Sequence, residues 1–375
     1  MVIIKEVNSR KELRKFIKFP FTLYKGYKYW IPPLVFDDWN TFRHDKNPAF
    51  EYADVAFFLA YKSGKPAGRV AAIINKRANS KWNAKDIRFG WIEFIDDVNV
   101  SRALLDAVAA WGKKRGMTRI HGPMGFTDCD PEGMLVDGFE KKSTITSIHN
   151  YPYYPQHMEQ LGFGKSVDWV QYKFNASQAV PEKVERMNQL IHKKYSLTTK
   201  LFTKRKELLK YTHGMFEAIN ASFQELYGFV PLTEKEIIRY TNTYIGMIDP
   251  ALACMVLNEN KQVVGFGLSA PSLSVAMQKA RGRLFPFGFI HLLRALRKYD
   301  EVDLYFNGVL PEWQHKGLNS IYFTELNKVY IRKQVTIAYS TNQLEGNKKA
   351  DNMWHNYEHE LYQRRRCYEK NIVLL

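Results

Sequence analysis

The residues whose types and spacing best suit chemistry lie at positions 308–319, where a glycine-containing loop follows an apolar run. The run at 303–310 predicts a strand, and Pro311 ends it because proline has no backbone N–H to donate. Apolar residues then recur at helical spacing over 321–330. The first backbone N–H groups of such a helix lack partners within it and lie at the positive end of its dipole. The loop is therefore predicted to bind a phosphate or a pyrophosphate.

The spacing of Gln314, Gly317 and Asn319 resembles the pyrophosphate loop of the GNAT superfamily of acyl-CoA-dependent N-acyltransferases. That loop is written as Gln or Arg, two residues, Gly, one residue, and then Gly or Ala. Gly317 stands where the backbone must approach the pyrophosphate closely, whereas Asn319 departs from the pattern and brings a side chain there. The cofactor-binding residues that the resemblance implies are Val309, Leu310, Gln314, His315, Lys316, Gly317, Leu318 and Asn319.

The resemblance also implies a reaction, in which the acyl-CoA lies between the central strand and the next one and an amine attacks the thioester directly. The next strand here is 335–340, and the backbone N–H of Val309 or Leu310 would hold the thioester carbonyl. A general base acting through water could be Glu345, just beyond that strand, or Glu225, in the early helices. Either could instead be an ordinary surface carboxylate.

For the acid that protonates the departing thiolate, the superfamily often has a tyrosine in the pattern Asn, two residues, Ala, three residues, Tyr. Asn347 and Ala350 match this pattern, but Trp354 occupies the place of the tyrosine and cannot donate a usable proton. Tyr357, three residues further on, is the candidate substitute. Trp354 and Tyr357 could equally be core aromatics, and a thiolate can leave without an acid.

A weak internal repeat indicates that the chain contains this fold twice. Residues 9–13 are echoed by 204–208, and the hairpin pattern at 54–70 is echoed by 250–266. The order of the echoes and their nearly constant offset indicate duplication. The predicted fold class is therefore α/β with a mixed sheet, arranged as two tandem GNAT-like domains.

Runs at 151–163 and 361–370 resemble a little-characterised bacterial family of tandem GNAT proteins, and this similarity extends over nearly the whole chain. We predict an N-terminal domain at 1–177 and a C-terminal domain at 178–375, with a linker helix at 181–195.

The two predicted domains differ at the position of the phosphate loop. In the first domain Asp96 and Asp97 stand between the central strand and the long helix, where they would repel a pyrophosphate. Carboxylates at that point are typical of a helix N-cap. The N-terminal domain is therefore predicted to be degenerate for cofactor binding, and the C-terminal domain to bind acyl-CoA.

The 375-residue chain has a net charge of +17 and a pI near 9.5, which favours acidic partners such as CoA phosphates, anionic lipid or nucleic acid. Nucleic acid is disfavoured because no nucleic-acid module is recognisable. The three cysteines lie far apart, which predicts a reducing cytoplasm, no disulfide framework and no metal site. No segment has the apolar run needed to span a bilayer.

The segment 269–299 is a basic insertion relative to the plain GNAT fold, and it contains no carboxylate. Apolar residues at 289, 292, 293 and 296 share one side of a helical wheel. A basic amphipathic helix of this kind predicts either peripheral contact with an anionic membrane or a lid that packs its apolar face on the protein. The basic residues are Lys279, Arg281, Arg283, Arg294, Arg297 and Lys298.

Together these features predict an acyl-CoA-dependent N-acyltransferase located in the cytoplasm, with peripheral contact at the inner membrane face as a further option. The co-substrate would be acetyl-CoA or a longer acyl-CoA, and the acceptor a small-molecule or lipid-like amine. Two alternatives stay open: a catalytically inactive tandem GNAT-fold binding protein, and a basic protein that binds nucleic acid or membrane. Tight acyl-CoA binding without turnover would mark the first alternative.

Overall fold

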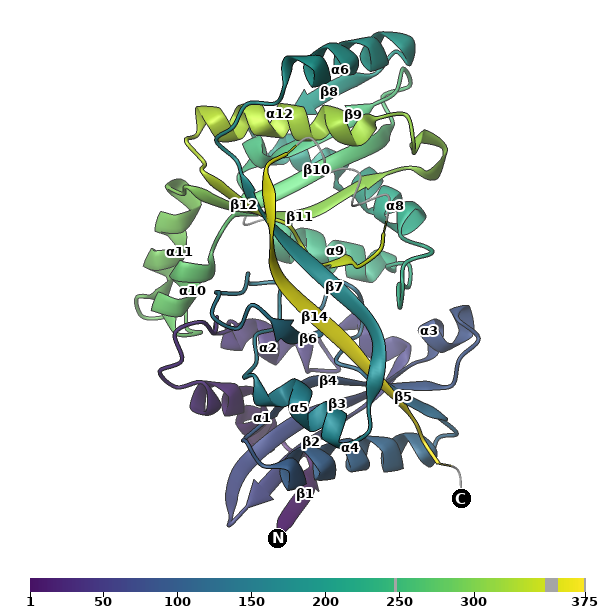
Figure 1. Cartoon of the computed structure of the whole chain (residues 1–375), viewed down its shortest axis with the longest axis vertical. Coiled ribbons are helices and arrows are strands. Elements are labelled where there is room, and N and C mark those ends of the chain that lie inside the picture. Colours follow the sequence, from purple (N-terminus) through teal and green to yellow (C-terminus); the bar gives the residue numbers. More distant parts are fainter. Residues whose placement is uncertain (246–247, 348–356, 374–375) are drawn as a thin grey trace. The chain divides into compact units, whose positions relative to one another are not determined.

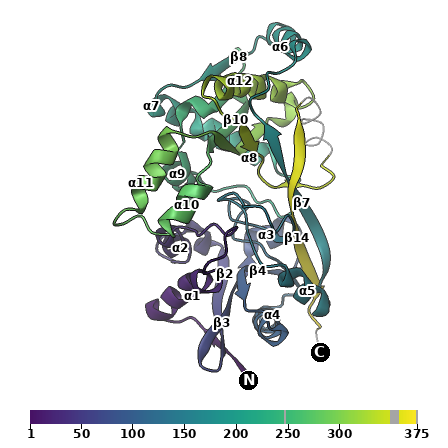
Figure 2. The ribbon, with the colours of Figure 1, turned by 60° about the vertical axis from the view of Figure 1, so that its left-hand side comes forward.

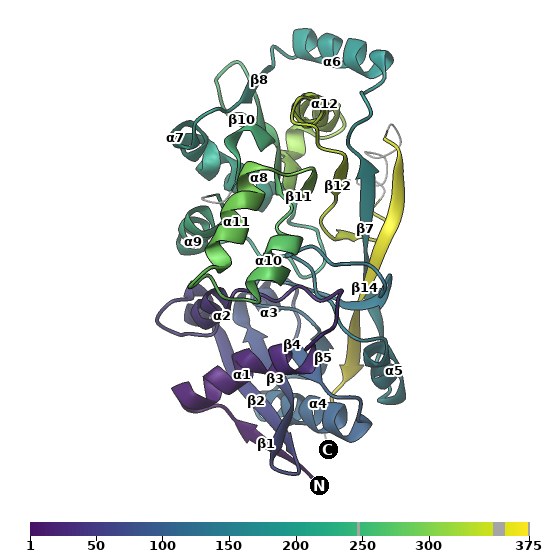
Figure 3. The same cartoon turned by 90° about the vertical axis from the view of Figure 1, so that its left-hand side faces the viewer.

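A computed structural model describes residues 1–245, 248–347 and 357–373, and these form two compact units (Figure 1). Unit 1 comprises Met1–Val170, Ser274–His291 and the chain from 363 onwards. Unit 2 comprises Gln171–Leu273 and the described residues of 292–362. Each unit is a mixed α/β assembly in which helices cover a sheet, as the sequence predicts (Figure 3).

The sheet of unit 1 has the strand order β1-β2-β3-β4-β5-β14, and β6 pairs with β14. Only β4 and β5 are parallel, and the other pairs are antiparallel. A two-residue turn at Ser63 and Gly64, both with positive φ, joins the second strand to the third, as in the tight turns that match strand twist. The strands are β1 (Val2–Glu6), β2 (Ala53–Lys62), β3 (Lys65–Asn75), β4 (Asp86–Phe94), β5 (Arg119–Gly122), β6 (Met134–Asp137) and part of β14 (His359–Asn371).

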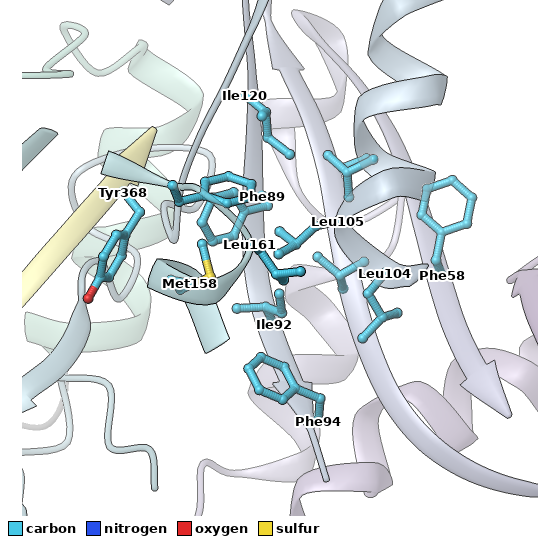
Figure 4. Packing of buried hydrophobic residues seen from close by; sticks show 14 of the residues in the cluster. Phe58, Phe89, Ile92, Phe94, Leu104, Leu105, Ile120, Met158, Leu161 and Tyr368 are labelled. Atoms are coloured by element: carbon cyan, nitrogen blue, oxygen red, sulfur yellow. The ribbon is translucent and has the colours of Figure 1, made fainter. Parts of the chain in front are cut away.

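The helices of unit 1 bury apolar stripes against this sheet. In α4 the residues Leu104, Leu105 and Val108 recur at helical spacing and are buried in the core with the aromatic side chains of the sheet (Figure 4). Figure 4 also shows Met158 and Leu161, from the region of α5, between the sheet and Tyr368. The helices are α1 (Arg10–Leu23), α2 (Val35–Thr41), α3 (Lys76–Lys81), α4 (Val98–Lys113), α5 (Tyr153–Gln160) and α10 (Ser274–Ala280), with a 3₁₀ turn η1 (Pro48–Glu51).

The sheet of unit 2 repeats the plan, with the order β8-β9-β10-β11-β12-β7. Here β11 and β12 are the parallel pair, in the position that β4 and β5 hold in unit 1. The strands are β8 (Thr198–Leu201), β9 (Ala253–Leu257), β10 (Val263–Pro271), β11 (Glu301–Val309), β12 (Ile337–Tyr339), part of β7 (Gly164–Asn175), and a two-residue strand β13 (Gln343–Leu344).

Helix α12 is the long helix of unit 2 and covers one face of its sheet. Its residues Leu318, Ile321 and Leu326 are buried against Val302 and Leu304 of β11. The helices are α6 (Glu182–Lys194), α7 (Arg205–Leu208), α8 (Thr212–Ser222), α9 (Glu234–Tyr244), α11 (Gly288–Arg297, which begins in unit 1) and α12 (Leu318–Arg332), with 3₁₀ turns η2 (Leu209–Tyr211), η4 (Pro250–Leu252) and η5 (Pro311–Trp313).

The two units are not continuous in sequence, which differs from the predicted domains at 1–177 and 178–375. Strand β7 begins in unit 1 and ends in the sheet of unit 2, where it pairs with β12. Strand β14 ends in the sheet of unit 1, where it pairs with β5. Each sheet thus ends in a strand that comes from the other half of the sequence. This strand pairs with the edge beside the parallel strands, whose backbone groups would otherwise lack partners.

Part of the basic insertion also belongs to unit 1. The Gln278 side chain donates hydrogen bonds to the carbonyls of Lys28, at 2.7 Å, and Trp30, at 3.0 Å. The carbonyl of Gly282 accepts a hydrogen bond from Val35 N–H at 3.0 Å. These contacts hold α10 beside α2 (Figure 2).

Strand β14 is held in unit 1 by a buried carboxylate. Asp168 of β7 accepts two hydrogen bonds from the guanidinium of Arg366, at 2.8 and 2.9 Å, and its oxygen lies 2.9 Å from Lys165 Nζ. Burial acts to raise the pKa of Asp168, but the bonds from Arg366 and Lys165 outweigh it and hold the pKa below its usual range. The ionised carboxylate is therefore a stabilising group of the folded state.

Replacing Arg366 by Met should lower the free energy of unfolding by about 2 kcal/mol, because the buried carboxylate loses its two-pronged partner. The matched control is Lys165→Met, which removes the more exposed partner and should cost less than about 1 kcal/mol. Chemical denaturation measures both.

The pH dependence of unfolding gives a second readout. Because the pKa of Asp168 is lowered on folding, its stabilisation is present above the unfolded-state pKa of about 4 and is lost as pH falls through the folded value. Arg366→Met should weaken this loss on acidification. Equal losses of stability in both variants would contradict the assignment of Arg366 as the principal partner.

Candidate functional site

The parallel strands β11 and β12 of unit 2 pair over a short distance and then part. Their register runs from Glu301 opposite Ile337 to Asp303 opposite Tyr339, which is three residue pairs. Strand β11 continues to Val309 and stays paired with β10 on its other side. The backbone groups of β11 beyond Asp303 that face the β12 side therefore have no strand partner there among the described residues, and we call this side of β11 the gap.

The alternation of an antiparallel pair shows which N–H groups face this gap. Leu310 N–H donates to the carbonyl of Val264 at 3.0 Å, so it points to β10. In an antiparallel pair of strands, hydrogen-bonded residue pairs alternate with pairs that are not hydrogen-bonded. Val309 opposite Gly265 and Asn307 opposite Gly267 are pairs of the second kind. The N–H groups of Val309 and Asn307 therefore point to the gap.

This corrects one residue of the predicted carbonyl site. Leu310 cannot offer its N–H to a thioester, because β10 already accepts it. Val309 remains a candidate, and Asn307 joins it. The sequence did not reveal which residue faced which way, because a bulge in β11 between the partners of Leu268 and Ser269 changes the alternation.

The predicted phosphate loop directly follows the gap. The turn η5 leads into Gln314, whose side chain donates to the carbonyl of Val309 at 3.3 Å, and so ties the loop back to the strand. Gly317 has φ of +81°, a value that favours glycine, and a Cβ there would lie 2.6 Å from Ile191 Cδ1. The backbone angle favours glycine at this position, and a larger side chain would also displace the end of Ile191 of α6.

The loop leads into the first turn of α12, which has no side-chain N-cap within the residues that the structure describes. The helix begins at Leu318, and no side chain accepts a hydrogen bond from its first N–H groups in the described part of the chain. These groups lie at the positive end of the helix dipole. Lys316 adds a positive charge, with its Nζ 4.5 Å from the ring centre of Trp313. The geometry therefore agrees with an anion site made by the loop and the first turn of α12.

A buried carboxylate that the sequence did not single out lies where the gap begins. Asp303 is 2% exposed, and among the residues that the structure describes neither of its oxygens makes a hydrogen bond. Burial raises the pKa of Asp303 to about 7, although the nearby Ser272 hydroxyl favours the ionised form. The one signal in the sequence was an acidic residue inside an otherwise apolar and aromatic run.

The predicted general base and acid lie in different surroundings. Glu345 is exposed in the turn after β13, and Glu225 is exposed between α8 and α9. Tyr357 lies against α12, with its ring centre 6.2 Å from that of Phe323, and burial raises its pKa to about 12 while a hydrogen bond with Thr324 lowers it. Their catalytic roles stay predictions.

Two residues of the predicted acid motif lie outside the described part of the chain. These are Ala350 and Trp354, while Asn347 is the last described residue before them. The placement of Tyr357 among the buried side chains of unit 2 agrees with the alternative that it is a core aromatic.

Unit 1 contains the equivalent position, and there its own side chains occupy the gap. Phe94 of β4 lies opposite Gly68, as Val309 of β11 lies opposite Gly265, so the two positions are equivalent. The residue after Phe94 also behaves like Leu310, because Ile95 N–H donates to the Ala67 carbonyl at 3.0 Å. Phe94 N–H donates to the hydroxyl of Tyr154 at 3.0 Å, and the hydroxyl of Tyr153 donates to the Phe94 carbonyl at 2.7 Å. Two tyrosines of α5 thus satisfy both backbone groups.

A buried network fixes these tyrosines. The hydroxyl of Tyr154 lies 2.8 Å from a carboxylate oxygen of Glu93, and Tyr24 donates to the same oxygen at 2.6 Å. Burial raises the pKa of Glu93, while Arg69 and the two hydroxyls act to lower it. Such a network leaves the Phe94 backbone no free group for a ligand.

One of the two acidic residues predicted to cap the long helix of unit 1 does so. Asp97 is the N-cap of α4, where it accepts a hydrogen bond from Asn99 N–H at 3.0 Å and forms an ion pair with Lys62. Asp96 instead lies 3.1 Å from His157. These contacts support the prediction that the first copy is degenerate for cofactor binding.

Solved structures share the fold of this chain. A tandem GNAT protein from the clavulanic acid biosynthesis pathway aligns over the whole of both chains with a TM-score of 0.58 and 11% identity. A GCN5-related glucosamine N-acetyltransferase region of a fungal multi-domain GH3 β-N-acetylglucosaminidase aligns over 99% of this chain and 38% of that one, with a TM-score of 0.54 and 12% identity. The chain has the tandem GNAT fold, which confirms the predicted α/β fold class.

Two curated proteins are similar in sequence. Protein YghO of Escherichia coli (strain K12) is 27% identical over 385 residues, which cover 99% of this chain and 95% of that protein. The bacterial ceramide synthase of Caulobacter vibrioides (strain NA1000 / CB15N) is 27% identical over 295 residues, which cover 78% of this chain and 75% of that protein. No protein-family model matches the chain. None of the described helices is both long and apolar enough to cross a membrane.

The anion site can be tested with Asn319→Asp, a nearly isosteric change in the first turn of α12. The new carboxylate should leave stability unchanged or raise it by about 0.5 kcal/mol, because the helix dipole favours negative charge there. The same charge should weaken the binding of CoA at least about tenfold, by repelling its phosphates. Calorimetry and thermal melting measure the two effects.

Asn319→Gln is the neutral control and should bind CoA much as the parent does. This pair is sharper than a change at Gly317, where φ of +81° makes any side chain strain the fold. An unaltered CoA affinity in Asn319→Asp would refute the anion site.

Proposed function

We propose that the chain is an acyl-CoA-dependent N-acyltransferase, and that its acyl-CoA binds along the gap between β11 and β12 in unit 2. One observation carries the proposal: the N–H groups of Asn307 and Val309 face a gap that leads straight into an uncapped helix terminus. The gap presents donors for the pantetheine and the thioester, and the helix terminus suits the pyrophosphate. Tandem GNAT relatives in the solved structures support the same reaction class.

The reaction requires little covalent participation by the protein. The neutral nitrogen of the amine attacks the thioester carbon, a C–N bond forms, and the carbonyl oxygen gains negative charge that the N–H groups of Asn307 or Val309 stabilise. The C–S bond then breaks and CoA leaves as a thiolate. The nitrogen loses one proton to a base, and the thiolate can take up a proton from water because its pKa is not far above neutrality.

Asp303 is the described carboxylate best suited to accept that proton. It lies at the start of the gap, is buried, and makes no hydrogen bond within the described residues that would hold its charge in another role. A carboxyl with a pKa of about 7 is a stronger base than an ordinary one and still ionises near neutral pH. We propose that a chain of water molecules carries the proton from the amine to Asp303.

The acceptor class follows from the relatives more than from the geometry. One relative, 27% identical over 295 residues, is named a bacterial ceramide synthase, and a ceramide is an N-acylated long-chain amino alcohol. We therefore propose a lipid-like amine as the acceptor and a longer acyl-CoA as the donor. A small-molecule amine with acetyl-CoA is the competing choice, and mass spectrometry of ligands that copurify with the protein distinguishes the two.

Asp303→Asn should lower kcat/KM about 100-fold or more, because the base is lost. Its effect on stability has the opposite sign. The pKa of the folded Asp303, about 7, lies above the unfolded value, so the carboxyl makes folding less favourable as pH rises between these values. Asn removes that penalty, and the variant should be at least as stable as the parent at pH 8.

Glu345→Gln is the comparison variant, since the sequence suggested Glu345 as the base. The parent should show a rising limb of kcat/KM with an apparent pKa near 7, and Glu345→Gln should retain it. If Glu345→Gln loses activity and Asp303→Asn does not, the base is Glu345. If the protein binds acyl-CoA tightly but transfers no acyl group to any amine tested, it is a binding protein and the enzymatic proposal fails.

The asymmetry of the units predicts the stoichiometry of binding. Because tyrosines of α5 occupy the backbone groups of Phe94 in unit 1, calorimetric titration with CoA should find one site per chain. Asn319→Asp should abolish most of that signal. A second site that persists in Asn319→Asp would show that unit 1 binds the cofactor as well.

A further inference from the structure

The loop between α10 and α11 carries phenylalanines into solvent. Phe285 is 78% exposed, Phe287 is 69% exposed, and Phe289, in the first turn of α11, is 36% exposed. Exposed apolar side chains scattered singly are ordinary, but three alternate residues of one aromatic type within one segment form a patch. A patch of this kind is typical of a contact surface.

The base of the loop is fixed to α2. Gly282 receives the hydrogen bond from Val35 N–H and packs against Phe21, where a Cβ on Gly282 would lie 2.4 Å from the ring. The residue after Val35 is Phe36, which is 64% exposed. A fourth exposed aromatic residue thus follows Val35, the residue whose N–H bonds to Gly282 at the base of the loop.

Helix α11 buries only part of the apolar side that the lid alternative requires. Leu292 is buried, but Leu293 is 47% exposed and lies one turn beyond the exposed Phe289. A lid packed on the described residues would cover Phe289 and Leu293 together, because they share one side of the helix. This side therefore continues the aromatic patch.

The charged residues within the segment 269–299 are all basic. No carboxylate occurs in 269–299, and six basic residues of this segment are exposed. The nearest acidic residue on α2 is Asp37, which is partly buried. The six are Lys279, Arg281, Arg283, Arg294, Arg297 and Lys298.

We propose that the segment 281–298 docks this protein on the surface of a bilayer that contains anionic lipid. The side chains of Phe285, Phe287 and Phe289 would enter the boundary between headgroups and acyl chains, and the basic residues would contact lipid phosphates. Charge complementarity selects a membrane with negative headgroups, and the exposed aromatic side chains select a bilayer over a merely charged surface. The proposal does not depend on the acyl-transfer reaction.

Vesicle cosedimentation tests the proposal with the full chain. The protein should bind vesicles of phosphatidylcholine mixed with phosphatidylglycerol, and bind phosphatidylcholine alone much more weakly. Replacing Arg281 and Arg283 by Gln should reduce the partition coefficient about fivefold for each residue, and high salt should do likewise. The double variant Phe285→Ser and Phe287→Ser should reduce it about tenfold or more.

Ile238→Ser is the matched control, because Ile238 is an exposed apolar residue on α9, outside the segment 281–298, and its change should leave binding unaltered. Circular dichroism checks that each variant is folded. Insertion has its own readout: in Phe287→Trp, brominated lipids should quench the added fluorescence.

Several results would overturn the proposal. One is failure of the parent protein to sediment with anionic vesicles at low salt. A second is binding that depends on Arg281 and Arg283 but not on Phe285 and Phe287, without quenching of Phe287→Trp, which would mean that the surface attracts any polyanion. A third is tighter binding to a single-stranded oligonucleotide that displaces the vesicles, which would make the segment a nucleic-acid surface.

Discussion

Two parallel strands that part leave a row of backbone N–H and C=O groups without a strand partner, and buried groups of this kind must be satisfied in some other way. Unit 1 solves the problem with its own side chains, since Tyr153 and Tyr154 bond to both backbone groups of Phe94. In unit 2 the side chains of Ser222 and Gln314 bond to the equivalent carbonyl, of Val309, but the Val309 N–H faces the gap. The same fold thus has one copy whose backbone groups at this position are already bonded and one copy whose N–H is available to a ligand. The tyrosines of α5 make the difference in unit 1.

The features that depend on neighbours in the sequence could be predicted from it. The glycine loop, the start of α12 near Leu318 and the capping role of Asp97 all follow from local rules of helix ends. The repeat was visible because both copies kept the same order of elements. These predictions needed only the residue types within a few positions of each site.

The features that depend on distant partners could not be predicted in this way. Leu310 was expected to face the thioester, but a bulge in β11 sets the alternation and turns its N–H toward Val264. Asp303 resembled a strand residue, and its lack of hydrogen bonds among the described residues is visible only once the sheet is assembled. The domain boundary was placed where the composition changes, whereas the exchange of β7 and β14 is decided by pairing across the length of the chain.

The exchange of strands has a consequence for how the protein is made. When the first half of the chain leaves the ribosome, its sheet ends at β5, because the strand that pairs there, from Tyr368 to Asn371, is synthesised much later. An exposed sheet edge can pair with other chains and so promotes aggregation. The nascent protein must therefore keep that edge covered until β14 emerges, and the pairing of β14 with β5 acts as the closing step in the folding of unit 1.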